Sequence, residues 1–451
     1  MSEAQPCSVA GEPARGLTVR VRESAASNRD IDLRVIVVPA DSQAPLPDPI
    51  VPLVGGPGQG AADLAANLLP RFEPYHEQRD IVFVDQSGTG LSNGLRCASP
   101  IDAAELMGTP FDHAHLAACR DERARHADLT RYTTAVAARD YEAVLDHLGY
   151  READFIGLSY GSRMGLEIAR QLPLRVRTLT IEAIAPATFT WPSLGAPDAD
   201  AALNTLIDDC AGDASCRQAF PRFRQDVDLA FTRVRQAPVM VTVRDSVSGA
   251  TLPVRFGESD LAYATRGILY GNDSLSLPLW FRSAAEGDFS AFAQAYVNRA
   301  RALDAQIALG VHFGVYCAED VPFVNWAAAE KAADGTHLGR FLLDQYRRAC
   351  EVWPRASIDL SLREPVQSSV PAQVMAGRRD PVTPSRTAEE AVRTLPRSAL
   401  LIWPHGAHGT DGLVSPTCRV AIVREFLRTA DPNALPLACA SRDQPLPFRL
   451  R

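Results

Sequence analysis

Short, nearly continuous apolar runs that alternate with helical patterns constrain the fold of this chain most. In the first half of the sequence these runs are residues 33–38, 50–54, 81–85, 155–158 and 178–181. The helical patterns between them cover residues 61–69, 134–148 and 160–171. Strands that are apolar on both sides are typical of a parallel sheet covered by helices on both faces. The strand–helix–strand order therefore predicts an α/β fold with a doubly wound, mostly parallel sheet.

The rhythm changes after Pro186. The chain then becomes mostly helical, with one hairpin pattern (239–243 and 251–256) around the turn at Ser248-Gly249. Helical patterns in this part cover residues 203–210, 261–270 and 290–306. Strand patterns return at 373–376 and 400–403, and a last helix follows near 419–429. We expect the first part of an α/β core over residues 1–186, an inserted, mainly helical cap over 187–365, and the second part of the core over 366–451.

The motif GLSYG at residues 157–161 carries the sharpest chemical signal. It follows a strand pattern and opens a helix pattern. So tight a turn strains the backbone at Ser159, requires glycines for close packing, and presents the hydroxyl beside a helix N-terminus, which favours developing negative charge. The alternative is a glycine-flanked serine in an ordinary turn. The strand-to-helix context favours a nucleophile, and we predict that Ser159 is one.

A serine hydroxyl is a weak nucleophile unless a base takes its proton. In serine hydrolases built on such a sheet, an acid and a histidine follow the serine along the chain, on loops after late strands. Asp380 fits the acid, because it lies in the loop RRDPVTP (378–384), which two prolines would stiffen. A turn-capping aspartate is the alternative interpretation. Glu182, directly after the strand pattern 178–181, is a competing acid.

The predicted base lies in the loop HGAHG (405–409), which contains two histidines. We favour His408 over His405, because His408 is farther into the loop and its small neighbours leave room to reach a serine. In the predicted triad, His408 takes the proton of Ser159. Asp380 fixes the tautomer of the histidine and stabilises the imidazolium.

A glycine-rich segment, GGPG at residues 55–58, follows the strand pattern 50–54. This is where an oxyanion loop belongs in such a fold. We predict that the backbone N–H of Gly56 and that of Tyr160, the residue after the nucleophile, hold the oxyanion. A simple Gly/Pro turn is the alternative. The segment lacks the Lys-Ser/Thr ending of a phosphate-binding loop, so it does not predict a nucleotide site.

Composition excludes several functional classes. With 451 residues, 46% hydrophobic and 22% charged, the chain has the make-up of a folded globular protein. Its net charge is −8, without a dense Lys/Arg run, and therefore predicts no nucleic-acid partner. No stretch approaches the ~20 apolar residues of a membrane helix. Residues 1–16 lack the basic start and apolar core of a signal peptide.

Nine cysteines are many for a cytosolic enzyme, and no CxxC pair indicates a zinc site. Disulfides in a periplasmic or secreted enzyme explain the number, provided that a signal peptide has been removed; buried free thiols are the alternative. An odd number leaves one cysteine unpaired, and Cys7, far from the others in sequence, is the candidate. Three pairs are close enough in sequence for local bridges: Cys210 with Cys216, Cys97 with Cys119, and Cys418 with Cys439.

Taken together, five ordered motifs resemble the proline iminopeptidase and tripeptidyl aminopeptidase group of serine peptidases, which have the α/β-hydrolase fold. The motifs are GGPGQG (55–60), DQSGTGLS (85–92), GLSYGS (157–162), GRRDPVTP (377–384) and AHG (407–409). The resemblance covers nearly the whole chain. It implies an exopeptidase that removes one to three residues from a peptide N-terminus, often with a preference for proline, and needs no metal or cofactor.

The exported, tripeptidyl branch of this group implies further details. Typical members are exported, which agrees with the cysteine content, and the resemblance adds a pairing of Cys317 with Cys350. The chain departs from the family at Ser87, where an arginine is usual, and at Ala407, where a glycine is usual. Exported relatives often carry a second early cysteine where residues 15–17 read RGL, which agrees with an unpaired Cys7.

An aminopeptidase must recognise an ammonium group, and a carboxylate in the cap is the obvious means. Glu319 and Asp320, in a segment common in the tripeptidyl branch, are the candidates. The alternative is an acidic helix cap, or an ion pair with one of the many arginines.

The resulting prediction is a serine exopeptidase for short peptides that acts through an acyl-enzyme on Ser159. An esterase or amidase with the same triad is the competing function, because the fold and the triad do not define specificity. A binding protein on a hydrolase scaffold would usually lack a triad member. We expect a small peptide as partner, no nucleic acid and no membrane; the sequence leaves the oligomeric state open.

Overall fold

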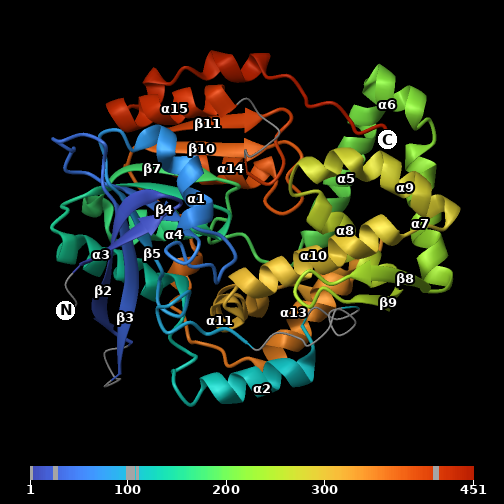
Figure 1. Cartoon of the computed structure of the whole chain (residues 1–451), viewed down its shortest axis with the longest axis horizontal. Coiled ribbons are helices and arrows are strands. Elements are labelled where there is room, and N and C mark those ends of the chain that lie inside the picture. Colours follow the sequence, from blue (N-terminus) through green and yellow to red (C-terminus); the bar gives the residue numbers. More distant parts are fainter. Residues whose placement is uncertain (1–3, 24–28, 98–106, 108–110, 410–415) are drawn as a thin grey trace.

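A nine-stranded sheet forms the core of one part of the protein, on the left in Figure 1. The computed structural model describes residues 4–23, 29–97, 107, 111–409 and 416–451. The strand order is β1-β2-β3-β5-β4-β6-β7-β10-β11. The strands from β5 to β11 run parallel, whereas β1, β2 and β3 add antiparallel ladders at one edge. The strands are β1 Gln5–Val9, β2 Glu12–Arg22, β3 Asp30–Val38, β4 Ile50–Leu53, β5 Ile81–Val84, β6 Ala153–Leu158, β7 Val176–Glu182, β10 Ala372–Gly377 and β11 Ser398–Trp403.

Helices cover both faces of this sheet, as the apolar strands require. All four residues of β4 and of β5 are buried, and neighbouring residues of one strand enter different apolar clusters. Val51 packs with the helices of one face, whereas Ile50 packs with those of the other. The helices of the first face are α3 Thr134–Leu148, α4 Tyr160–Gln171 and α14 Ser385–Val392, and those of the second face are α1 Ala65–Phe72 and α15 Pro416–Thr429. The predicted doubly wound sheet is confirmed.

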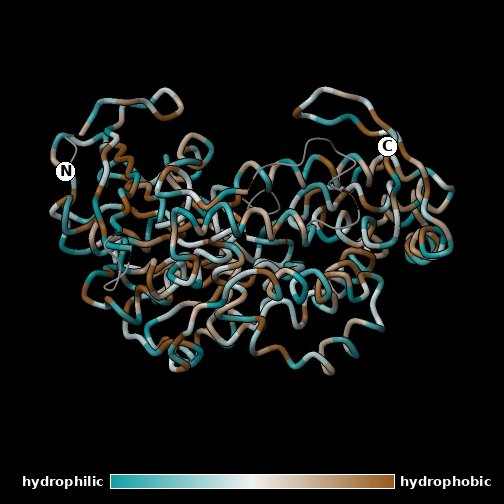
Figure 2. Tube along the Cα trace, turned by 90° about the horizontal axis from the view of Figure 1, so that it is seen from below, coloured by the Kyte–Doolittle hydropathy of each residue, from teal (hydrophilic) through white to brown (hydrophobic). Residues whose placement is uncertain are grey.

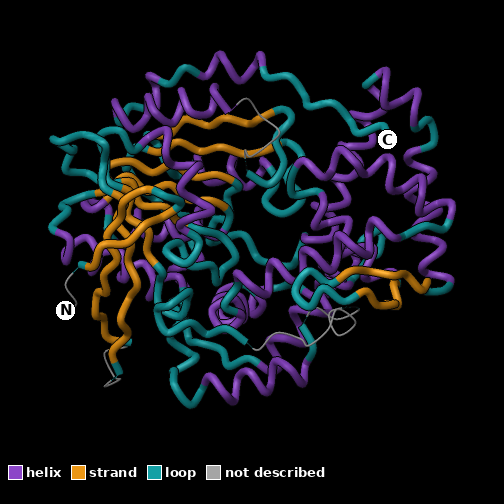
Figure 3. Tube along the Cα trace, in the orientation of Figure 1, coloured by secondary structure: helices purple, strands orange, loops and turns teal. Residues whose placement is uncertain are grey.

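A second group of helices has an apolar core of its own, and Figure 3 shows it beside the sheet. It includes α5 Gly195–Gly212, α6 Ala214–Ala219, α7 Phe223–Gln236, α8 Glu258–Ile268, α9 Leu277–Glu286, α10 Ser290–Gln306 and α12 Trp326–Ala333. The predicted hairpin is present as β8 Val239–Arg244 and β9 Thr251–Phe256. We call this group the cap.

Three helices outside the cap complete the fold: α2 His113–Arg123, α11 Leu309–Glu319 and α13 Phe341–Val352. Apolar side chains of all three, such as Leu116, Phe313 and Ala349, belong to the apolar cluster of the sheet. The segment predicted as cap, residues 187–365, therefore contains two helices that pack with the core. Its proposed boundaries stay a prediction.

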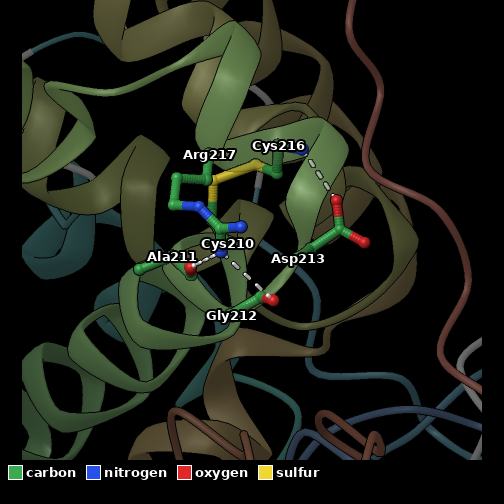
Figure 4. Close-up of a disulfide and its surroundings, with 6 residues drawn as sticks. All are labelled: Cys210, Ala211, Gly212, Asp213, Cys216 and Arg217. Carbon is green, nitrogen blue, oxygen red and sulfur yellow. Dashed lines mark hydrogen bonds between the residues drawn. A yellow bond between two sulfur atoms is a disulfide. The ribbon is translucent and has the colours of Figure 1, made fainter.

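Four disulfides link neighbouring elements, in the pairing expected from the sequence. Figure 4 shows the bridge that ties α5 to α6, where the Asp213 side chain accepts a hydrogen bond from Cys216 N at 2.7 Å. Cys7 has a free thiol. The four bridges are Cys97–Cys119, Cys210–Cys216, Cys317–Cys350 and Cys418–Cys439.

The two ends of the chain lie at opposite ends of the molecule (Figures 1 and 2). After α15 the chain runs back to the cap, where Arg449 N donates to Leu275 O at 3.0 Å. Phe448 packs there against Leu275 and Ala407, and so joins the cap to the loop of the predicted base. Among the helices of the described ranges, none has the length and apolarity needed to cross a bilayer.

Candidate active site

Ser159 lies at the sharp turn between β6 and α4, as the motif predicted. Its φ of 59° is in the left-handed region, which strains a residue with a side chain. A Cβ on Gly157 would lie 2.3 Å from the carbonyl oxygen of Gly161, and one on Gly161 would lie 2.1 Å from that of Leu53. Only glycine allows this approach. The turn leaves Ser159 half-buried at the carboxyl end of the strand.

The glycine-rich loop of the predicted oxyanion site lies beside this serine. A Cβ on Gly55 would lie 3.4 Å from Ser159 Cβ. Gly55 N donates to the side chain of Gln59 at 3.1 Å. Within the described chain, the N–H groups of Gly56 and Tyr160 have no hydrogen-bond acceptor. Tyr160 is the first residue of α4, where backbone N–H groups lack a partner in the helix. Two free donors therefore lie close to the Ser159 turn.

Helix α11 and the residue before it fix the loop through its carbonyl groups. Three successive carbonyl oxygens accept hydrogen bonds from this side, so the loop has a defined orientation. The bonds run from the Tyr316 hydroxyl to Gly56 O at 3.4 Å, from His312 Nδ1 to Pro57 O at 3.1 Å, and from Ala308 N to Gly58 O at 2.9 Å. Because a carbonyl only accepts, the proton of the imidazole is on Nδ1, and Nε2 accepts from the Tyr346 hydroxyl at 2.9 Å.

A pH-dependent loss of stability follows from this histidine. Burial lowers the pKa of His312 to about 4. In the unfolded chain this histidine binds its proton near pH 6.5. The free energy of unfolding therefore falls by on the order of 3 kcal/mol as the pH drops from about 6.5 toward 4, because only the unfolded chain gains the proton in this range. We expect the free energy of unfolding, measured by urea titration, to decrease less between pH 7 and pH 5 in His312→Gln than in the wild type. The exposed His126, replaced in the same way, is the control. An equal pH slope in wild type and His312→Gln would contradict this role.

Asp380 follows β10, and donors from its own loop surround its carboxylate. Oδ1 accepts from Val382 N at 2.8 Å and Thr383 N at 2.9 Å, and Oδ2 accepts from Thr383 Oγ1 at 2.8 Å. Its side chain is fully buried. These bonds fix the position of the carboxylate.

His408 lies against this carboxylate. Its Nδ1 is 3.0 Å from each oxygen of Asp380, which leaves Nε2 as the nitrogen that can face a hydroxyl. The loop of His408 reaches the end of β6, since a Cβ on Gly409 would lie 2.8 Å from Leu158 Cδ1. The structure therefore brings Asp380 and His408 together, and the loop of His408 contacts Leu158, the residue before Ser159.

The cap closes over this histidine. His408 N donates to Tyr270 O at 3.2 Å, and the two rings pack edge to face with centroids 4.7 Å apart. Tyr270 follows the last turn of α8. The sequence does not predict this contact, because nothing in the order of residues shows that a cap segment returns to the loop after β11.

The competing residues occupy different environments. The carbonyl of His405 accepts from Arg379 Nη2 at 2.6 Å, and its ring makes no contact with Asp380 among the described residues. Glu182 is buried at the end of β7 and forms ion pairs with Arg419 at 2.6 Å and Arg71 at 2.7 Å. The Glu182 carboxylate, the alternative candidate for the acid, is therefore paired with two guanidinium groups.

Glu319 and Asp320 lie at the end of α11, where they contact the core. Asp320 is fully buried and pairs with Arg163 at 2.9 Å and Arg363 at 3.2 Å, which is the ion-pair alternative. Glu319 accepts from Thr134 N at 2.6 Å and Thr134 Oγ1 at 2.7 Å. Burial raises the pKa of Glu319, and the nearby Arg163 opposes this effect. In the described chain neither carboxylate contacts Ser159 or His408, and amine binding by them stays a prediction.

The described residues include no group of three or more His, Cys, Asp or Glu side chains placed to bind a metal ion.

Comparison with known proteins agrees with the fold and the motifs. A family model described as "alpha/beta hydrolase fold" matches residues 48–264, and one described as "TAP-like protein" matches residues 336–439. A tripeptidyl aminopeptidase of Streptomyces coelicolor is 24% identical over 432 residues, which are 87% of this chain and 76% of that protein. The serine protease Hip1 of Mycobacterium bovis is 28% identical over 181 residues, which are 36% of this chain and 35% of that protein.

Among solved structures, a proline iminopeptidase of Mycobacterium smegmatis matches with 17% identity and a TM-score of 0.44, over 93% of this chain and 99% of that one. The two family models together span both the nucleophile turn and the loops of Asp380 and His408. The resemblance drawn from the motifs is thus confirmed: this chain belongs to the α/β-hydrolase family, in its TAP-like branch.

Proposed function

We propose that this protein is a serine aminopeptidase that removes one to three residues from the N-terminus of short peptides through an acyl-enzyme on Ser159. The observation that carries the proposal is the Asp380–His408 pair, in which Nδ1 is 3.0 Å from both carboxylate oxygens. The loop of His408 lies beside the Ser159 turn. The tripeptidyl aminopeptidases among the relatives support a peptide substrate.

The proposed reaction has two halves, acylation of Ser159 and hydrolysis of the acyl-enzyme. His408, Asp380 and the two N–H donors act in both. His408 Nε2 takes the proton of Ser159 Oγ while Oγ bonds to the carbonyl carbon of the scissile peptide. The N–H groups of Gly56 and Tyr160 stabilise the oxyanion of the tetrahedral intermediate. The C–N bond then breaks, and the leaving amine takes the proton from His408. Water repeats these steps on the acyl-enzyme and releases the N-terminal fragment.

Asp380 orients His408 in this reaction and stabilises the imidazolium after proton transfer. Three donors from residues 382 and 383 keep the carboxylate in one position, so the imidazole does not have to reorient during catalysis. We also propose that the protein works outside the cytosol, in the periplasm or as a secreted enzyme. Four disulfides support this location, because such bonds persist in oxidising compartments.

A substrate panel tests the peptidase function against the esterase or amidase alternative. Tripeptidyl anilides and simple acyl esters are compared, with each peptide both free and acetylated at its N-terminus. We expect the free peptides to have a kcat/KM roughly 10- to 150-fold higher, the value of one charge-assisted contact with the ammonium. If Glu319 makes this contact, Glu319→Gln removes most of the preference. Equal cleavage of free and acetylated peptides would refute an aminopeptidase and favour an amidase or esterase.

A further inference from the structure

Two arginines of the cap lie on the tyrosine that packs against His408. The guanidinium carbon of Arg299 is 4.1 Å from the ring centroid of Tyr270, and that of Arg266 is 5.3 Å from it. Arg266 Nη2 also donates to the Tyr270 hydroxyl at 3.0 Å. Both cations are thus one aromatic ring away from the imidazole of the proposed triad. Arg266 belongs to α8 and Arg299 to α10.

Arg266 is buried, and no carboxylate of the described residues pairs with it. Its exposed fraction is 8%, and its Nε has no hydrogen-bond partner. In the described ranges it forms no ion pair, whereas other buried arginines, such as Arg163 and Arg301, pair with an aspartate. A buried charge without a counter-ion is costly. The ring of Trp191, 4.8 Å from its guanidinium carbon, and that of Tyr270 offset part of this cost.

Arg299 completes the arrangement from the other helix. A Cβ on Gly267 would lie 2.4 Å from Arg299 Cδ, so the missing side chain at the end of α8 makes room for this arginine to cross. Its Nη1 is 3.5 Å from Gly267 O, and the Tyr263 hydroxyl is also a partner. Arg299 has no ion pair with a described carboxylate either. Helix packing therefore positions two guanidinium groups that have no counter-ion among the residues the structure describes.

We propose that Arg266 and Arg299 form a carboxylate-binding subsite that selects peptides with a negative charge near the scissile bond. The proposal rests on the peptidase function above and names the charge of its substrate. A guanidinium offers paired N–H donors that match a carboxylate. Both guanidinium groups contact Tyr270, whose ring packs against His408. The carboxylate can be the C-terminus of a short peptide or an acidic side chain, and both present the same two oxygens.

Binding to the full-length Ser159→Ala protein tests the subsite without turnover. Calorimetry compares a tetrapeptide Ala-Ala-Pro-Ala as the free acid with its C-terminal amide, and amidated tetrapeptides with Asp or Asn at each position in turn. We expect either the C-terminal acid and amide pair or one of the Asp and Asn pairs to favour the acid about 10- to 150-fold, the range for a hydrogen-bonded charge. A preference for the free acid over the C-terminal amide identifies the C-terminus as the bound carboxylate. A preference for Asp over Asn identifies an acidic side chain.

Three arginine variants in the same background assign this preference. Arg266→Gln and Arg299→Gln should each bring the acid-to-amide affinity ratio close to 1. Arg282→Gln should leave it unchanged, because Arg282 also stacks on a ring of the cap but on Phe220, at 4.9 Å. Circular dichroism shows which variants fold. If Arg266→Gln does not fold, the variant of the half-exposed Arg299 tests the subsite by itself.

Two results would overturn the subsite. One is an acid-to-amide affinity ratio within about twofold for every pair in the Ser159→Ala protein, or no detectable binding of any of these peptides. The other is a preference that persists in the folded arginine variants. The peptidase function fails differently, through the absence of an acyl-enzyme on Ser159 or of peptide cleavage.

Discussion

Replacing Ser159 by alanine is expected to lower kcat by roughly 10³-fold or more, because the variant has no oxygen to form the acyl-enzyme. The residual rate would come from the oxyanion donors and from substrate binding, which the substitution leaves in place. Ser290→Ala, at an exposed serine that begins α10, is the matched control and should keep wild-type turnover. Turnover is measured with the best tripeptidyl anilide or ester of the substrate panel.

A kcat within about tenfold of wild type in Ser159→Ala would remove this residue from the chemistry. Alanine relieves no strain at this position, since it still carries a Cβ at a φ of 59°. The folded state of the variant therefore stays comparable with wild type, and a thermal unfolding curve verifies this.

The second large effect separates the two histidines of one loop. We expect His408→Ala to lose about as much turnover as Ser159→Ala, because residues of a triad act as a unit. His405→Ala should keep most of the activity. The reason is that, of the two histidine rings, that of His408 contacts Asp380, at 3.0 Å. The His405 carbonyl that accepts a hydrogen bond from Arg379 belongs to the backbone and survives the substitution. Steady-state kinetics at pH 8, with both variants at equal concentration, measure this difference.

The opposite ranking would move the base to His405 and would also remove Asp380 from its role as the acid. Equal, small losses in both variants would show that neither histidine is the base. Both outcomes contradict the proposed mechanism and leave the fold untouched.

The central strands and the helices next to them were predictable, because burial on both faces leaves a continuous apolar run. Helices α3, α4 and α10 have the ends that their sequence patterns predicted. Strands β1 and β2 were not predicted. β2 contains the alternating segment Thr18 to Arg22, whose arginines are exposed, so it lacks a continuous apolar run. Its register with β3 depends on contacts that only the folded sheet provides.

For the candidate site, local motifs predicted what the chain holds close together in sequence. The turn at Ser159 and the loops of Asp380 and His408 each follow a strand, and parallel strands bring these ends to one edge of the sheet. The contact of Tyr270 with His408 and the positions of Arg266 and Arg299 were not predictable. These contacts join α8, α10 and the last loop, and no periodic pattern encodes the packing of an inserted cap on a distant loop.

The partners of Glu319 and Asp320 were equally beyond the sequence. An acidic pair beside a cysteine is compatible with a ligand site or with ion pairs, and the choice depends on where arginines from other elements lie. Here Arg163 from α4 and Arg363, after α13, both reach Asp320. The burial of a charged group and its counter-ions are decided together, by tertiary structure.

Covalent labelling by a fluorophosphonate tests the central claim most directly. The wild-type protein is treated with the reagent, digested and mapped by mass spectrometry, and the remaining activity is measured in the same samples. The proposed mechanism predicts one adduct per chain, on Ser159, with activity lost in proportion to labelling and no adduct after unfolding. An adduct on another residue, or full activity with Ser159 labelled, would contradict it.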